Sequence, residues 1–124
     1  GGALFLLGGE RERNFNQSLM TLSNHPLFNT GHDNSLLEFA GFISMMDLII
    51  TSDTLGMHLA IALKKPVIAL FGPTSPQEID LYDRGRKLFA GLDCSPCYRQ
   101  TCPDLKCLKA ITPQMVLEAA RKLL

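Results

Sequence analysis

The chain has 124 residues, 46% of them hydrophobic and 19% charged, a composition typical of a soluble globular domain with one core. Its formal net charge is zero, so no global field recruits nucleic acid or an anionic membrane. No apolar run reaches the ~18 residues that cross a bilayer, and the start lacks the features of a signal peptide. We expect a cytoplasmic protein, and the opening almost inside an apolar strand indicates an excised or incomplete chain.

Apolar runs of strand length alternate with segments of helical periodicity. In chain order the sequence predicts a strand at Leu4–Leu7, a helix over 11–23, a strand at Pro26–Thr30, a helix over 35–46, a strand at Asp47–Ser52, a helix over 55–63, a strand at Val67–Phe71, a short helix at 76–82, a strand at Lys87–Ala90, an irregular segment 93–109 and a helix from Thr112. This alternation with apolar strands predicts an α/β fold, a doubly wound parallel sheet in one domain over residues 1–124.

Three helix ends carry local signals. Ser35 and Glu38 have the spacing of a capping box, in which each side chain bonds the other residue's amide. The helix over 55–63 should end at the lysines before Pro66, because proline cannot continue a helix. Thr112 followed by Pro113 predicts an N-cap and first helical position.

Charge is distributed unevenly along the chain. Residues 1–62 carry two basic and six acidic side chains, whereas residues 63–124 carry ten basic and six acidic ones. The basic half favours an anionic ligand, and a solvated mixed surface is the commoner explanation.

The turn after the strand Asp47–Ser52 has the clearest ligand-binding pattern. Open α/β sheets bind ligands beyond the carboxyl ends of their strands, and free amides at a helix start favour phosphate. Glycine there allows close backbone approach, and histidine can donate to a phosphate oxygen; the turn carries Asp53, Thr54, Gly56 and His58. The structural alternatives are an N-cap role for Asp53 or Thr54 and a half-buried His58.

Two further stretches follow predicted strands. Gly72, Thr74 and Ser75 could contact phosphate or sugar, and the alternative is a turn whose glycine and prolines only set the backbone angles. Glu10 and Glu12 follow the first strand, where an acid can accept from ribose hydroxyls or simply be solvated. The spacing G-x-G-x-x-G of a dinucleotide site is absent.

The four cysteines are spaced C-x2-C-x4-C-x4-C, at Cys94, Cys97, Cys102 and Cys107. A four-thiolate structural zinc site, one or two disulfides, and ordinary thiols in a loop are the alternatives. The gaps differ from the paired C-x2-C knuckles of most zinc ribbons.

The run DTLGMHLA at Asp53–Ala60, followed by PVIALFGPTSP at Pro66–Pro76, resembles the carboxy-terminal domain of the bacterial heptosyltransferases. These are the family-nine glycosyltransferases of lipopolysaccharide core synthesis. The Ser35 helix start matches in position, and many members carry a cysteine-bearing segment after FGPT. The resemblance implies the carboxy-terminal half of a GT-B glycosyltransferase, whose two Rossmann-like domains enclose the active site.

The resemblance also implies a set of roles. Asp53, Thr54 and Gly56 would line the site of a nucleotide-diphosphate sugar, ADP-heptose in known cases, with His58 near its phosphates. Glu10 or Glu12 would bind ribose. No metal cofactor is required if protein groups stabilise the leaving group. The catalytic base would lie in a missing amino-terminal domain, so no catalytic residue is expected here and this fragment alone should be inactive.

The implied acceptor is the lipopolysaccharide core or a related glycan, at the inner face of the cytoplasmic membrane. Leu55 stands where the family often has glycine, and a phosphate-binding lysine would precede residue 1. Two rival functions are another nucleotide-sugar enzyme such as an epimerase, and a metal-stapled interaction module that uses residues 93–109.

Overall fold

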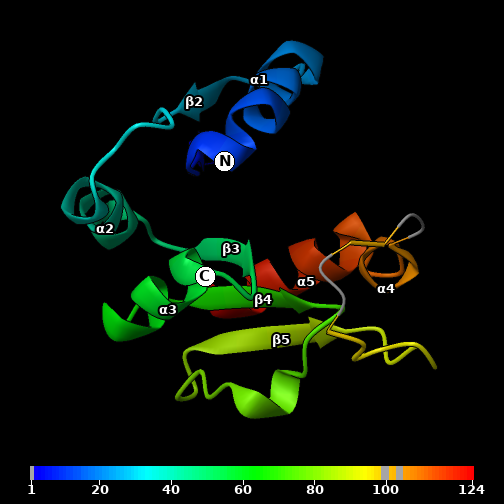
Figure 1. Ribbon diagram of the computed structural model, residues 1–124. Helices are drawn as coiled ribbons and strands as arrows, with labels where there is room; N and C mark the ends of the chain where they lie inside the picture. The colour runs from blue at the N-terminus through cyan, green and yellow to red at the C-terminus, as the bar shows by residue number, and fades with distance from the viewer. Residues whose placement is uncertain (1, 99–100, 103–104) are drawn as a thin grey trace. The chain divides into compact units, whose positions relative to one another are not determined.

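The chain folds into parallel β-ladders with helices between the strands. The computed structural model describes residues 2–98, 101–102 and 105–124 (Figure 1). Two compact units are distinguished: unit 1 runs to Phe42, and unit 2 spans Ile43–Leu124. Helix α2 (Leu36–Met45) crosses the boundary between the two.

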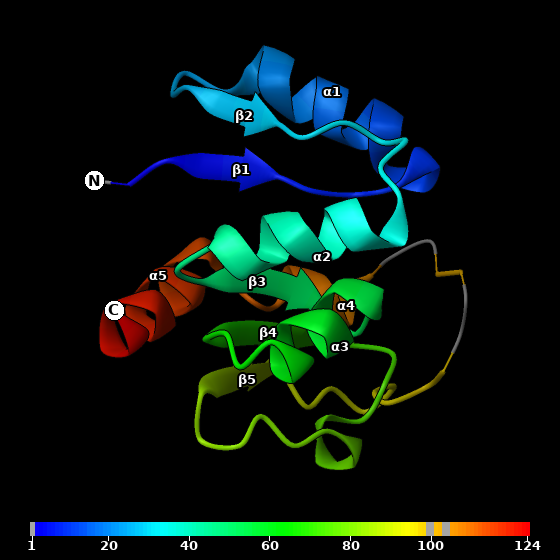
Figure 2. The same cartoon turned by 90° about the vertical axis from the view of Figure 1, so that its left-hand side faces the viewer.

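Unit 1 is built on two short parallel strands. β1 (Leu4–Leu6) is followed by the 3-10 helix η1 (Glu10–Glu12), α1 (Arg13–Leu22) and β2 (Leu27–Asn29). Phe5 of β1 stacks on Phe28 of β2 with ring centroids 5.1 Å apart, and α1 runs alongside the pair (Figure 2). The buried amide of Asn16 donates to the Leu7 carbonyl at 3.3 Å. That bond ties α1 to the end of β1.

Unit 2 contains a three-stranded parallel sheet in the order β3-β4-β5. Its elements in chain order are β3 (Ile49–Ser52), α3 (Leu55–Ala62), β4 (Val67–Phe71), η2 (Pro76–Glu78), β5 (Gly85–Phe89), α4 (Lys106–Lys109) and α5 (Pro113–Leu123). α3 covers one side of this sheet, and α4 and α5 cover the other (Figure 2). The central strand β4 supplies most of the core, because Val67, Ile68, Ala69 and Phe71 are all buried.

The predicted α/β fold with parallel strands is confirmed, and so are the local signals at helix ends. Glu38 accepts from the Ser35 amide at 3.0 Å, while Ser35 accepts from the Glu38 amide at 3.2 Å. Thr112 accepts from the Met115 amide at 3.3 Å at the start of α5. After α3, Lys64 takes a left-handed conformation with φ 60°, and the chain leaves the helix before Pro66.

Several element ends differ from the sequence prediction by one or two residues, and β5 begins at Gly85 rather than Lys87. Three differences are larger. The described strands form two parallel ladders, β1-β2 and β3-β4-β5, rather than the one sheet predicted. The short helix at 76–82 is a single 3-10 turn, Pro76–Glu78. The segment 93–109, expected to be irregular, contains α4, whose four residues are too few to show helical periodicity in sequence.

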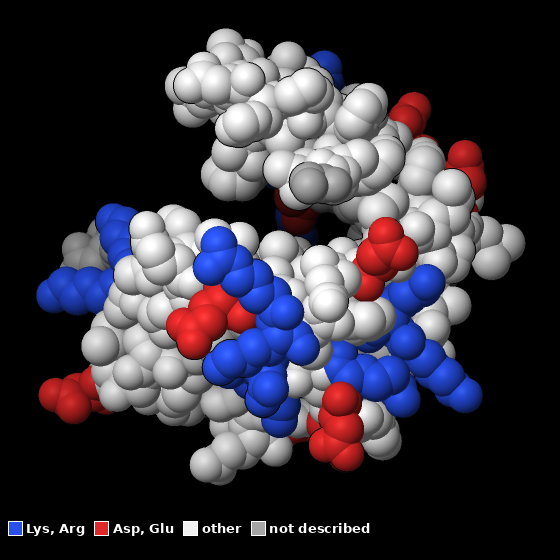
Figure 3. Space-filling model, turned by 180° about the vertical axis from the view of Figure 1, so that it is seen from behind, with Lys and Arg blue, Asp and Glu red and all other residues white. Residues whose placement is uncertain are grey.

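The surface of unit 2 carries both signs of charge. On the face in Figure 3, lysine and arginine side chains are interspersed with aspartate and glutamate. This pattern fits the solvated mixed surface better than a field of one sign. None of the helices in the described ranges combines the length and apolar character that a bilayer span requires.

The Ser35–Glu38 capping box predicts a specific pH dependence. Bonds from the Ser35 amide and hydroxyl lower the pKa of Glu38 below its ordinary value of 4.5. A depressed folded-state pKa gives stability that is present above the unfolded value and is lost as pH falls through the folded one. At pH values above 4.5, Glu38→Gln should therefore have a lower melting temperature than wild type. This difference should shrink as the pH is lowered. A difference in melting temperature that does not change with pH would contradict this prediction.

Candidate functional site

The ends of β3 and β4 form the central part of the candidate site. The two strands pair in parallel with Ser52 opposite Leu70, so the residues that follow each strand emerge at the same edge of the sheet. The predicted stretches Asp53–His58 and Gly72–Ser75 begin at this edge. Loops at the carboxyl edge of a parallel sheet are where such folds bind ligands.

Thr54 occupies the N-cap position of α3 without using its side chain as a cap. Its backbone is extended, with φ −139° and ψ 175°. The Thr54 hydroxyl lies 3.0 Å from the Thr51 hydroxyl and donates to the Ser52 carbonyl at 3.4 Å. Within the described residues, no side chain accepts from the first amides of α3. Those amides can therefore receive an external anion.

Asp53 and His58 come together across this turn. The His58 Nε2 atom lies 3.7 Å from the Asp53 Oδ1 atom. The His58 side chain is 58% exposed and the Asp53 side chain 23%, so the histidine is not the half-buried residue of the structural alternative. An exposed histidine beside the open start of a helix can donate to a bound anion.

The residues of the Gly72–Ser75 loop differ in what they contact. Gly72 is buried, and a Cβ there would lie 2.6 Å from the Cys107 Sγ atom. The Ser75 hydroxyl caps η2 by accepting from the Gln77 amide at 3.3 Å. The Thr74 hydroxyl has no hydrogen-bond partner among the described residues, so it is the group of this loop that is available to a ligand.

Tyr98 contacts the Gly72–Ser75 loop, and the sequence did not predict this contact. Its amide donates to the Pro73 carbonyl at 2.7 Å, and its hydroxyl donates to the Glu78 carboxylate at 2.7 Å. The Glu78 hydrogen bond raises the pKa of Tyr98, and bonds from Ser75 act in the opposite direction. No sequence signal pointed to this residue, because contacts over 20 positions leave no periodic pattern.

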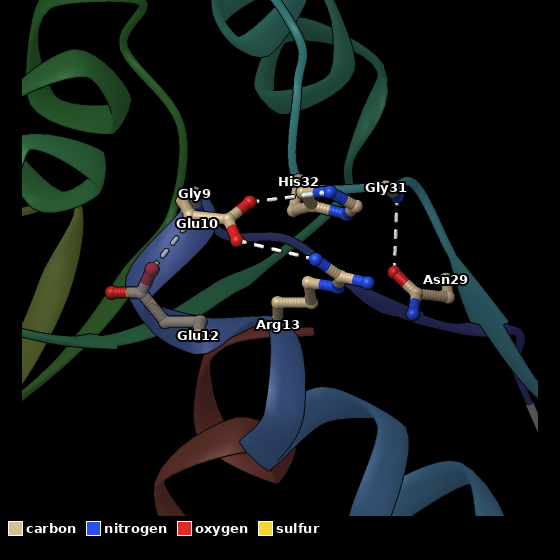
Figure 4. A network of polar contacts seen from close by, with 7 residues as sticks. All are labelled: Gly9, Glu10, Glu12, Arg13, Asn29, Gly31 and His32. Atoms are coloured by element: carbon tan, nitrogen blue, oxygen red, sulfur yellow. Dashed lines mark hydrogen bonds and ion pairs between the residues drawn. The ribbon is translucent and has the colours of Figure 1, made fainter.

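The turn after β1 holds its two glutamates differently (Figure 4). The Glu12 carboxylate accepts from the Gly9 amide at 2.9 Å and so closes the turn. The Glu10 carboxylate lies between Arg13, at 3.4 Å, and His32, at 3.2 Å. Arg13 and His32 also line a polar cavity of about 260 Å³ in unit 1, together with Asn14, Asn16, Gln17 and Asn29. Unit 1 thus carries a carboxylate beside a cavity lined by hydrogen-bonding groups.

The four cysteines occupy different environments. Cys94 and Cys97 are exposed, Cys107 is buried, and the partly buried Cys102 accepts from the Leu105 amide at 3.4 Å. Across residues 2–98, 101–102 and 105–124, no three His, Cys, Asp or Glu side chains gather to hold a metal ion. The zinc site stays a prediction, and the metal content of the reduced, folded protein would test it.

Comparison with known proteins gives a consistent result. The model of "Glycosyltransferase family 9 (heptosyltransferase)" matches residues 2–108. A lipooligosaccharide heptosyltransferase 2 from Campylobacter jejuni is 37% identical over 86 residues, which are 66% of this chain and 27% of that protein. Lipopolysaccharide heptosyltransferase 2 from Escherichia coli is 36% identical over 92 residues, 66% of this chain and 24% of that protein.

A solved structure agrees with the sequence matches. The "Structure of E. coli ADP-heptose lps heptosyltransferase II" superposes with a TM-score of 0.82 at 27% identity. The match covers 99% of this chain and 36% of that one. The alignments with the curated relatives extend over about a quarter of their length.

Proposed function

Since this chain belongs to glycosyltransferase family 9, we propose that it holds the nucleotide-diphosphate sugar in a glycosyl transfer reaction. The donor is ADP-heptose or a close analogue, and the acceptor is a lipopolysaccharide core or related glycan. The observation that carries the proposal is the open start of α3, where Thr54 leaves the helix amides uncapped beside Asp53 and His58.

The names of the relatives support the choice of substrates. The Campylobacter jejuni and Escherichia coli relatives are named as heptosyltransferases acting on lipooligosaccharide or lipopolysaccharide. The superposed Escherichia coli enzyme is called an ADP-heptose heptosyltransferase. These names favour a heptosyl donor on an adenosine diphosphate over other nucleotide sugars.

The mechanism needs groups that stabilise a departing diphosphate. An acceptor hydroxyl attacks the anomeric carbon with inversion, the bond from that carbon to the diphosphate oxygen breaks, and the electron pair stays on the diphosphate. The first amides of α3 and the His58 ring can donate to the diphosphate, the dipole of that helix favours its negative charge, and preorganised donors lower such a barrier. The acceptor proton passes to a base outside this chain, as the family resemblance implies.

Removing the His58 ring tests the phosphate contact. We expect His58→Ala to weaken ADP binding by about tenfold to a hundredfold, as the loss of a hydrogen bond to a charged group does. Adenosine, which lacks the diphosphate, should bind wild type and variant equally. Calorimetric titration of both ligands measures the difference.

His25→Ala is the matched control, because His25 is an exposed histidine that engages Ser23 only through its backbone. It should bind ADP like wild type. Equal ADP affinity in wild type and His58→Ala would remove His58 from the donor site, and no binding of ADP or another nucleoside diphosphate would refute the proposed function.

Either Glu10 or Glu12 is the proposed ribose-binding acid. Carboxylate oxygens accept from the ribose hydroxyls, so the wild type should prefer ADP to 2′-deoxyADP. Glu10→Gln and Glu12→Gln, compared separately, identify the residue, since only the variant at the ribose-binding position should lose that preference. If both variants keep it, neither glutamate contacts the ribose.

A further inference from the structure

The cysteine-bearing segment holds the Gly72–Ser75 loop at two points. At the start of the loop, the buried Cys107 of α4 packs against Gly72, where a Cβ would come within 2.6 Å of its sulfur. At the next residue, the Pro73 carbonyl accepts from the Tyr98 amide at 2.7 Å. The loop therefore rests on residues that follow it by some 25 to 35 positions in the sequence.

The Tyr98 side chain adds a third attachment beyond the loop. Its hydroxyl donates to the Glu78 carboxylate of η2 at 2.7 Å. Ser75 caps η2 through the Gln77 amide at the same time. One tyrosine thus joins the loop and the turn after it through its backbone and its hydroxyl.

Thr74 lies between these attachments. The Pro73 carbonyl before it accepts from the Tyr98 amide, and the Ser75 hydroxyl after it caps η2. The Thr74 hydroxyl itself has no partner among the described residues. A side chain whose flanking backbone is fixed and whose polar group is open is pre-organised for a ligand. Tyr98 is 53% exposed, so its contacts with the loop do not depend on burying its ring in the core.

We propose that Tyr98 is a positioning residue for the donor site: with Glu78 as its acceptor, it fixes the Gly72–Ser75 loop in the conformation that meets the diphosphate. Tyr98 and Cys107 thereby support that loop. This inference rests on the proposed function, because it assumes that the loop contacts the phosphates of the donor.

The experiment measures ADP and adenosine affinity in Tyr98→Phe, Glu78→Ala and Glu78→Gln of the 124-residue chain. Tyr98→Phe and Glu78→Ala should each weaken ADP binding by about threefold to tenfold, the usual effect of losing one hydrogen bond. Adenosine affinity should not change. Glu78→Gln should retain most of the ADP affinity, because its amide oxygen still accepts from the tyrosine hydroxyl.

Two controls separate positioning from general destabilisation. Tyr82→Phe removes the hydroxyl of the other exposed tyrosine in the chain and should leave ADP affinity unchanged. The double variant Tyr98→Phe/Glu78→Ala should bind ADP no more weakly than the weaker single variant, because both changes remove the same bond. Melting curves confirm that each variant is folded.

The inference and the proposed function fail in different ways. Where wild type binds ADP more tightly than adenosine and Tyr98→Phe binds ADP with the same affinity as wild type, the positioning role is wrong. If Tyr98→Phe weakens ADP and adenosine alike, Tyr98 has only a structural role. If wild type binds neither ligand, or both equally, the diphosphate site itself is refuted and the inference falls with it.

Discussion

Phe71→Ala is expected to lower the free energy of unfolding by about 3–5 kcal/mol, the usual range for truncating a buried aromatic side chain. Phe71 is fully buried at the end of β4, the central strand of the three-stranded sheet. Alanine would leave a cavity at the residue that directly precedes the Gly72–Ser75 loop. Chemical denaturation followed by far-UV circular dichroism measures the loss.

Phe71→Leu is the control for cavity size, because leucine fills most of the space. It should cost less than about 1.5 kcal/mol if the surrounding side chains repack. Equal stability of Phe71→Ala and wild type would show that the end of β4 is not packed as described, and the placement of the loop would then be wrong.

Gly85→Ala is expected to cost about 3 kcal/mol although it adds a single methyl group, at the upper end of overpacking effects. Gly85 pairs with Val67 between β5 and β4, and a Cβ there would lie 2.3 Å from the Val67 carbonyl oxygen. That atom belongs to the backbone of the central strand and cannot rotate away. The two strands must separate locally, which should lower both the unfolding free energy and the melting temperature.

Gly41→Ala gives the same chemical change in an open position. A Cβ at Gly41 in α2 meets no atom within 4 Å. There, alanine should raise stability by about 0.5–1 kcal/mol, because glycine is costly inside a helix. Similar effects of the two substitutions would contradict the close approach of Gly85 to β4.

Local chemistry made much of the fold predictable. Val67–Phe71 was predicted with its observed bounds, because proline precedes the apolar run and Gly72-Pro73 follows it. The Ser35–Glu38 box depends on two residues three positions apart, so its sequence is enough to predict its hydrogen bonds. The division of the strands into two ladders depends on long-range pairing, which apolar periodicity does not encode.

The candidate site was predictable in outline but not in its contacts. The turn Asp53–His58 follows β3 at the edge of the sheet, as predicted, and ligand binding at this edge stays a prediction. The sequence did not indicate that Thr54 would turn toward Thr51 and leave the helix amides open, since either orientation satisfies its hydroxyl. The sequence also did not indicate that Gly72, a predicted ligand contact, packs against Cys107 from a distant segment.

Titration of the isotope-labelled chain with ADP tests the central claim most directly. If the start of α3 and the loop after β4 hold the diphosphate, amide resonances of Leu55–Met57 and Thr74–Ser75 should shift on addition of ADP. Adenosine alone should leave them unchanged. An ADP titration that moves no resonance in these two stretches, or that moves only resonances of α5 (Pro113–Leu123), would contradict the proposed donor site.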